Sequence, residues 1–152
     1  MIKGVLAIVV VGVLIGAGAW LSNRPGPQWQ PISAADAATK IEWQPSLEAA
    51  ITEARRSGKP IVADFFATWC GPCKMMDQQT YPDPRVAAEA ERWVMVQIDV
   101  DKHPEIAQRY RASALPTIAF LKSDGTPVTG FQGFAPPEDM LNMMQQAYPK
   151  TQ

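Results

Sequence analysis

The chain contains only two cysteines, Cys70 and Cys73, and they are three positions apart. Side chains at positions i and i+3 lie on the same face of a helical turn, so the two thiols are close enough to form a disulfide. A bridge across two intervening residues closes a very short loop and stabilises a fold little. We therefore expect this pair to serve thiol–disulfide chemistry rather than to staple the structure.

The pair also sits where a helix is expected to begin, near Cys70, with the helix running to about Thr80. The first thiol would then lie beside unpaired backbone N–H groups and the positive end of the helix dipole, which stabilise a thiolate. Cys70 is thus predicted to be the nucleophile. Cys73, one turn deeper, is predicted to resolve the mixed disulfide. Pro72 lacks an N–H group, which costs little in a first helical turn.

Other chemistries of a cysteine pair find less support in this sequence. Zinc takes four ligands, whereas the chain has no second cysteine pair and a single histidine, His103. Met75 and Met76 leave delivery of a soft metal such as copper as an alternative function, although consecutive helical positions point apart. We predict no metal and no cofactor. The net charge of −1 and the scattered basic residues predict no nucleic-acid partner.

Hydrophobic periodicity and turn residues predict an α/β fold, with a central mixed β-sheet flanked by helices. Strands alternate with helices first, and a hairpin and a last helix follow. The expected strands are 41–43, 60–66, 93–100, 117–121 and 128–131, and the expected helices are 47–57, 70–80, 84–92, 104–110 and 137–148.

The N-terminus carries an uncharged run of 17 residues, VLAIVVVGVLIGAGAWL, at positions 5–21. This length is at the lower limit for a membrane-spanning helix and is also close to that of a signal-peptide core. We expect an uncleaved membrane anchor, with a cleaved signal peptide as the alternative. Three prolines in the following segment indicate an extended linker. The expected organisation is therefore anchor 1–21, linker 22–40 and domain 41–152.

The stretch VADFFATWCGPCK, residues 62–74, closely resembles the active-site segment of thioredoxins, and the resemblance extends from about Ser46 to Tyr148. The stretch ALPT at 114–117 matches a second landmark of that family, in which the proline is cis and lies against the disulfide. The resemblance implies a thioredoxin fold and a buried acid, Asp64, that relays a proton to and from the resolving cysteine. It also implies a set of residues that support the cysteine pair and bind substrate: Trp69, Gly71, Pro72, Leu115 and Pro116.

The resemblance has one departure at the buried acid. In thioredoxins a lysine usually pairs with that acid, and Met95 is predicted to stand in its place here. We therefore expect a raised pKa for Asp64, because burial without a counter-charge disfavours the carboxylate.

The segment QQTYPDPRV, residues 78–86, resembles the C-terminal thioredoxin domain of the membrane electron conductor DsbD and its small anchored relatives. With the N-terminal run, this implies a monomeric protein outside the cytoplasm, periplasmic and held at the inner membrane. Its expected activity is reduction of protein disulfides by the dithiol, which a membrane electron donor of the DsbD type would regenerate. Net disulfide oxidation or isomerisation stays open as an alternative, as does copper delivery.

Overall fold

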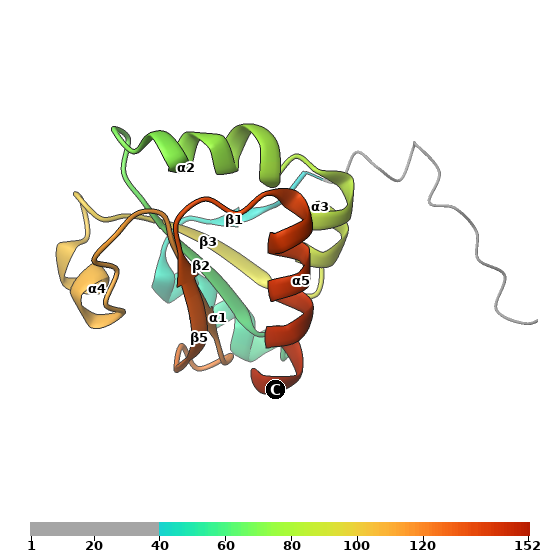
Figure 1. Ribbon diagram of the computed structural model, residues 1–152. Helices are drawn as coiled ribbons and strands as arrows, with labels where there is room; N and C mark the ends of the chain where they lie inside the picture. Colours follow the sequence, from blue (N-terminus) through green and yellow to red (C-terminus); the bar gives the residue numbers. More distant parts are fainter. Residues whose placement is uncertain (1–39) are drawn as a thin grey trace, which may run out of the picture. The chain divides into compact units, whose positions relative to one another are not determined.

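A computed structural model describes residues 40–152, and the predicted anchor and most of the predicted linker lie outside that range. Within the described part of the chain, no helix is both long and apolar enough to cross a bilayer. A five-stranded sheet in the order β1-β3-β2-β4-β5 forms the centre of the domain (Figure 1). Its strands are β1 Trp43–Gln44, β2 Ile61–Phe66, β3 Val94–Asp99, β4 Thr117–Leu121 and β5 Pro127–Gln132.

The sheet is mixed, as predicted. Strands β1 and β2 both pair in parallel with β3, whereas β4 pairs antiparallel with β2 and with β5. The parallel strands β2 and β3 therefore end at the same edge of the sheet, and the segment that carries the cysteines leaves from that edge. The helical elements are α1 Leu47–Ser57, α2 Gly71–Met75, η2 Met76–Thr80, α3 Pro84–Ala90, α4 Pro104–Arg109, α5 Pro137–Ala147 and η3 Tyr148–Lys150.

Helices cover both faces of the sheet, which makes β2 and β3 apolar on both sides. Side chains of α1 and α4 pack on one face against residues such as Phe65 and Ile98. Side chains of η2, α3 and α5 pack on the other face against residues such as Val62 and Phe120. Figure 1 shows α3 and α5 side by side, with α1 behind the sheet.

Helix α1 illustrates how local sequence sets an element's ends. The Ser46 side chain accepts the backbone N–H of Ala49 and caps the first turn. Gly58 ends the helix in the left-handed conformation, with φ of 73°. The helix therefore has the bounds 47–57 that the sequence predicts.

The helix after the cysteines differs from the predicted one. An unbroken helix over 70–80 is expected from sequence, but the structure divides it into α2 and the π-helical segment η2. The N–H of Tyr81 bonds to the carbonyl of Met76, five residues earlier, at 3.0 Å. The Thr80 hydroxyl donates to the carbonyl of Ala135 at 2.6 Å and ties this turn to the chain before α5. The π-helical turn therefore occurs together with a hydrogen bond to a distant segment, which the local sequence does not predict.

Candidate active site

Cys70 and Cys73 form a disulfide at the start of α2. Cys70 is the N-cap residue of the helix, and its Sγ accepts the backbone N–H of Cys73 at 3.2 Å. Gly71 and Pro72 make the first turn between the two cysteines. The first sulfur therefore already holds a hydrogen-bond donor that would stabilise its thiolate after reduction.

Solvent exposure does not separate the two cysteines in the disulfide form. Cys70 is 4% exposed and Cys73 is 3% exposed, so burial alone protects the second cysteine hardly more than the first. Both pack against Ala67, with Phe66, Val100 and Leu115 around them. The hydrogen bond and the adjoining groove, rather than exposure, distinguish the first sulfur from the second.

A shallow groove of about 400 Å³ borders Cys70 but not Cys73. Trp69 forms one of its walls with a side chain that is 68% exposed, and its Nε1–H donates to Asp101 Oδ2 at 2.9 Å. Two further residues of the same segment, Gly71 and Pro72, and two other segments complete the lining with Val100, Ala112, Ser113, Ala114 and Leu115. The structure thus brings Trp69, Gly71, Pro72 and Leu115 to one surface beside the first sulfur.

Pro116 follows Leu115 and is buried, and the peptide bond between them is cis. The proline is the residue directly before β4. The peptide geometry agrees with the expectation drawn from the thioredoxin resemblance.

Asp64 lies in the middle of β2 and is 2% exposed. Its Oδ2 accepts hydrogen bonds from the hydroxyl of Tyr81 at 2.9 Å and from Nε2 of Gln97 at 3.2 Å. Burial raises the pKa of this carboxyl from 3.8 to about 6, Asp77 adds to the rise, and the two hydrogen bonds oppose it. The predicted burial and upward shift of the pKa are both present.

The prediction that Met95 faces Asp64 is wrong. In the parallel pairing of β2 with β3, Asp64 lies opposite Gln97 and Met95 lies opposite Val62. Gln97 and Met95 are two positions apart on β3, so their side chains point to the same face of the sheet. Met95 lies one side-chain repeat further toward the start of the strand. A neutral amide, not a methionine, therefore stands beside the buried acid.

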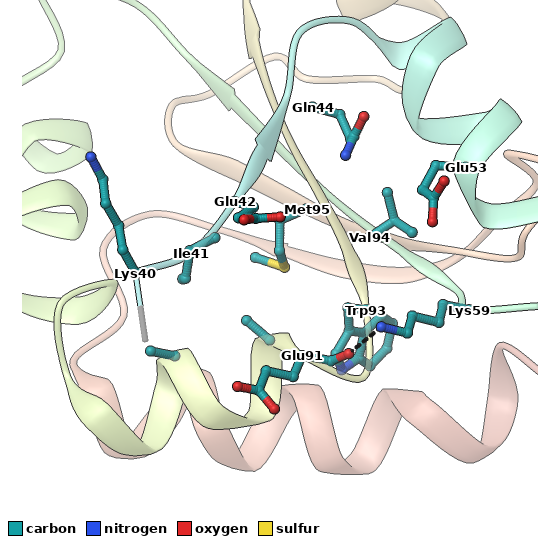
Figure 2. Close-up of a pocket in the computed structure, with 12 residues that line it drawn as sticks. Lys40, Ile41, Glu42, Gln44, Glu53, Lys59, Glu91, Trp93, Val94 and Met95 are labelled. Carbon is teal, nitrogen blue, oxygen red and sulfur yellow. Dashed lines mark hydrogen bonds between the residues drawn. The ribbon is translucent and has the colours of Figure 1, made fainter. Parts of the chain in front are cut away.

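Met95 instead lines a second hollow, of about 440 Å³, near the start of β3 (Figure 2). Figure 2 shows it beside Ile41 and Glu42, and the Lys59 ammonium in the same hollow donates to the carbonyl of Glu91 at 2.7 Å. This hollow is at the opposite end of β3 from the disulfide and contains neither cysteine. Its size exceeds that of the groove at Cys70, yet it holds no group suited to redox chemistry.

Sequence reasoning missed the polar partners of Asp64. Gln97 Nε2 bridges Asp64 Oδ2 and Asp77 Oδ1, at 3.2 and 3.0 Å. A glutamine within an apolar strand was the available signal for this contact. Tyr81 carried no such signal, because its contact with Asp64 depends on the π-helical turn.

The methionines beside the pair face apart, as predicted: Met75 is exposed and Met76 is buried. Among residues 40–152, no group of three or more histidine, cysteine, aspartate or glutamate side chains is placed to hold a metal ion.

Comparison with known proteins agrees with this geometry. A family profile described as "Thioredoxin-like domain" matches residues 47–148. The chain belongs to this thioredoxin-like family, and its disulfide-forming CxxC pair fits a thiol–disulfide oxidoreductase.

Individual relatives include the thiol:disulfide interchange protein DsbD of Vibrio vulnificus, which is 33% identical over 142 residues. That match covers 83% of this chain but only 24% of the relative, so the chain spans about a quarter of the DsbD length. The thioredoxin-like protein slr0233 of Synechocystis is 37% identical over 90 residues, covering 59% of this chain and 82% of that protein.

Solved structures show the same likeness. A thioredoxin from Thermus thermophilus superposes with a TM-score of 0.64 at 27% identity, covering 71% of this chain and 87% of that one. The oxidised C-terminal domain of Neisseria meningitidis DsbD superposes with a TM-score of 0.56 at 26% identity, covering 65% of this chain and 90% of that domain.

Proposed function

We propose that this protein reduces disulfides of other proteins outside the cytoplasm, using Cys70 and Cys73 as its dithiol. The observation that carries the proposal is the position of Cys70. Its sulfur caps α2 and accepts a backbone N–H, and the residue borders a groove that Cys73 does not line. A protein segment lying in this groove would present its own disulfide to that sulfur.

The reaction balances within the dithiol and the substrate. The Cys70 thiolate attacks one sulfur of the substrate disulfide, and the other substrate sulfur leaves as a thiolate and takes a proton. Cys73 then loses its proton and attacks the Cys70 sulfur, which breaks the mixed disulfide and releases the second substrate thiolate. The substrate has gained two electrons, and the chain is left with the Cys70–Cys73 disulfide seen here.

Asp64 is the proposed acceptor of the Cys73 proton. It lies on the sheet face that packs against η2, the segment that directly follows α2 and Cys73, because it shares that face with Val62, two residues earlier. With a pKa of about 6, its carboxyl gains and loses a proton near neutral pH, as a general base requires.

The partners and location follow from likeness to DsbD and from the N-terminal sequence. Alignment with a DsbD over 142 residues supports a membrane electron donor of the DsbD type that reduces the disulfide again. The apolar run at 5–21 supports attachment to the inner membrane, with the domain in the periplasm. The proposed protein acts as a monomer. We retain signal-peptide cleavage as the alternative arrangement of this segment.

Insulin reduction with dithiothreitol as the terminal reductant tests the activity. We expect the native chain to accelerate reduction, and Cys70→Ser and Cys73→Ser to lower the rate to that of dithiothreitol alone. Cys73→Ala should trap a mixed disulfide between Cys70 and its substrate. Ser123→Ala, in the turn after β4 and far in sequence from the cysteine pair, serves as the control and should keep the native rate. Native activity in Cys70→Ser would contradict the assignment.

The direction of electron flow is tested by equilibration with glutathione. A reductant of the thioredoxin type has a potential near about −270 mV, whereas a strong oxidant lies near about −120 mV. We expect the lower value, because Gly71-Pro72 is the dipeptide of reducing thioredoxins. A potential near −120 mV would support net oxidation instead.

A further inference from the structure

The carboxyl group of Asp64 has two oxygens in unlike surroundings. Oδ2 accepts from both Tyr81 and Gln97, whereas Oδ1 is buried and has no hydrogen-bond partner among residues 40–152. It is the sole buried side-chain nitrogen or oxygen in the described part of the chain that lacks one. Buried polar atoms are normally paired, so Oδ1 is the carboxyl oxygen that no described group occupies and that is left free to gain or lose a proton.

The Tyr81 hydroxyl reaches Oδ2 because of the π-helical segment. Tyr81 directly follows η2, and its N–H bonds five residues back to Met76 rather than four. This wider turn rotates Tyr81 relative to its place in a continuous α-helix. The ring is then held edge-on to Trp43, with ring centroids 5.0 Å apart, and the side chain is buried.

Tyr81 can act only as a donor to Asp64 near neutral pH. Burial, together with the neighbouring carboxylate, raises the pKa of the Tyr81 hydroxyl well above its usual range, so it keeps its proton. The other groups that face Asp64 are Asp77 from η2, Gln97 from β3 and the apolar Ile118 from β4. Tyr81 is therefore the sole hydroxyl donor that holds the carboxyl among the described residues.

We propose that Tyr81 is a positioning residue whose hydroxyl, placed by the π-helical turn, occupies Oδ2 of Asp64 and so confines proton exchange with Cys73 to Oδ1. The inference rests on the proposed role of Asp64 in the reductase. It adds that the pH range of turnover depends on a tyrosine outside the cysteine motif.

Tyr81→Phe tests this proposal, with Tyr110→Phe as a matched control. Tyr110 also donates one hydrogen bond, to the carbonyl of Gly125 at 2.8 Å, but it lies on the opposite face of the sheet. In the oxidised protein, the ¹³C shift of the Asp64 carboxyl reports its titration without interference from thiols. We expect Tyr81→Phe to move this titration upward by about one pH unit, since a hydrogen bond to a charged group changes the equilibrium about tenfold. Tyr110→Phe should leave the titration midpoint of the Asp64 carboxyl unchanged.

A second variant covers the case in which Tyr81→Phe does not fold. Replacing Tyr81 with 3-fluorotyrosine keeps the shape and makes the hydroxyl a stronger donor, so the titration of Asp64 should move downward. An unchanged titration in both variants, or an equal shift in Tyr110→Phe, would overturn the positioning role.

Insulin reduction separates this inference from the proposed function. The acid limb of the pH–rate profile should move with the carboxyl titration in each Tyr81 variant. Shifted titrations in a protein that cannot reduce insulin would uphold the Tyr81 contact and refute the reductase. Native activity with the same pH–rate profile in both Tyr81 variants as in the native chain would uphold the reductase and overturn the positioning role.

Discussion

The backbone N–H of Cys73 donates a 3.2 Å hydrogen bond to Sγ of Cys70 across the first turn of α2. The hydrogen bond distinguishes the two cysteines, because Sγ of Cys70 accepts an N–H from Cys73 whereas Sγ of Cys73 accepts none from Cys70. After reduction, this donor and the start of the helix favour a thiolate at Cys70. Near-equal burial of the two cysteines does not weaken that difference, because it arises from the backbone.

We expect Cys70 to be alkylated faster than Cys73 in the reduced protein. Brief treatment with iodoacetamide at pH 6, followed by mass mapping, measures the two rates. The single-thiol variants Cys70→Ser and Cys73→Ser provide matched rates without competition between thiols. Faster labelling of Cys73 in both experiments would reverse the proposed roles.

Asp64→Asn should stabilise the protein at pH 7 and slow its turnover. The folded-state pKa of about 6 lies above the ordinary 3.8, so the folded protein binds this proton more tightly than the unfolded chain does. The contribution of Asp64 to the free energy of unfolding is therefore largest below pH 4, falls as pH rises to about 6, and then stays level, with a loss on the order of 3 kcal/mol. Asn at this position removes that slope, although its buried amide offsets part of the gain.

Denaturant unfolding between pH 4 and pH 8 measures that slope. Asp139→Asn, an exposed position in the first turn of α5, is the matched control and should retain it. A less stable Asp64→Asn protein with normal insulin reduction would identify Asp64 as a structural acid.

Trp69 and Trp93 should respond oppositely to replacement by phenylalanine. Trp69 is exposed at the groove, so Trp69→Phe should leave unfolding almost unchanged and lower kcat/KM for insulin about fivefold, as loss of about 1 kcal/mol of contact would. Trp93 is buried against Phe120 and Tyr148, so Trp93→Phe should cost on the order of 1–2 kcal/mol of stability and leave kcat/KM intact. If Trp69→Phe and Trp93→Phe changed stability equally and also changed kcat/KM equally, the result would argue against a substrate contact at Trp69.

Gly130 should not tolerate a side chain. A Cβ at this position in β5 would lie 2.4 Å from the carbonyl oxygen of Ile118 in β4, and backbone cannot move aside cheaply. We expect Gly130→Ala to destabilise the protein by about 2 kcal/mol or more in denaturant unfolding. Gly71→Ala is the control, because nothing lies within 4 Å of its Cβ. Equal unfolding midpoints for the two variants would contradict the close approach of the strands.

Local signals made most of the fold predictable. Ser46 and Gly58 mark the ends of α1 through bonds and dihedral angles that involve only nearby residues. The cysteine motif likewise predicted a helix start at Cys70, and the structure confirms it. These features need no knowledge of which strands pair.

The surroundings of Asp64 were harder to predict, because they depend on contacts between distant segments. Gln97 is 33 positions away, and its contact requires the register of β2 with β3. A register displaced by two residues keeps the same side chains on the same face, so periodicity alone does not choose between Met95 and Gln97. The Tyr81 contact depends in addition on a π-helical turn, which has no clear residue signature.

The burial of the disulfide also affects how fast different reductants react with it. With Cys70 and Cys73 both under 5% exposed, little of the disulfide meets bulk solvent directly. The groove beside Cys70 offers a reductant an extended surface next to the first sulfur. We therefore expect a protein donor that fits this groove to reduce the disulfide faster than small thiols such as dithiothreitol or glutathione, which still reach it.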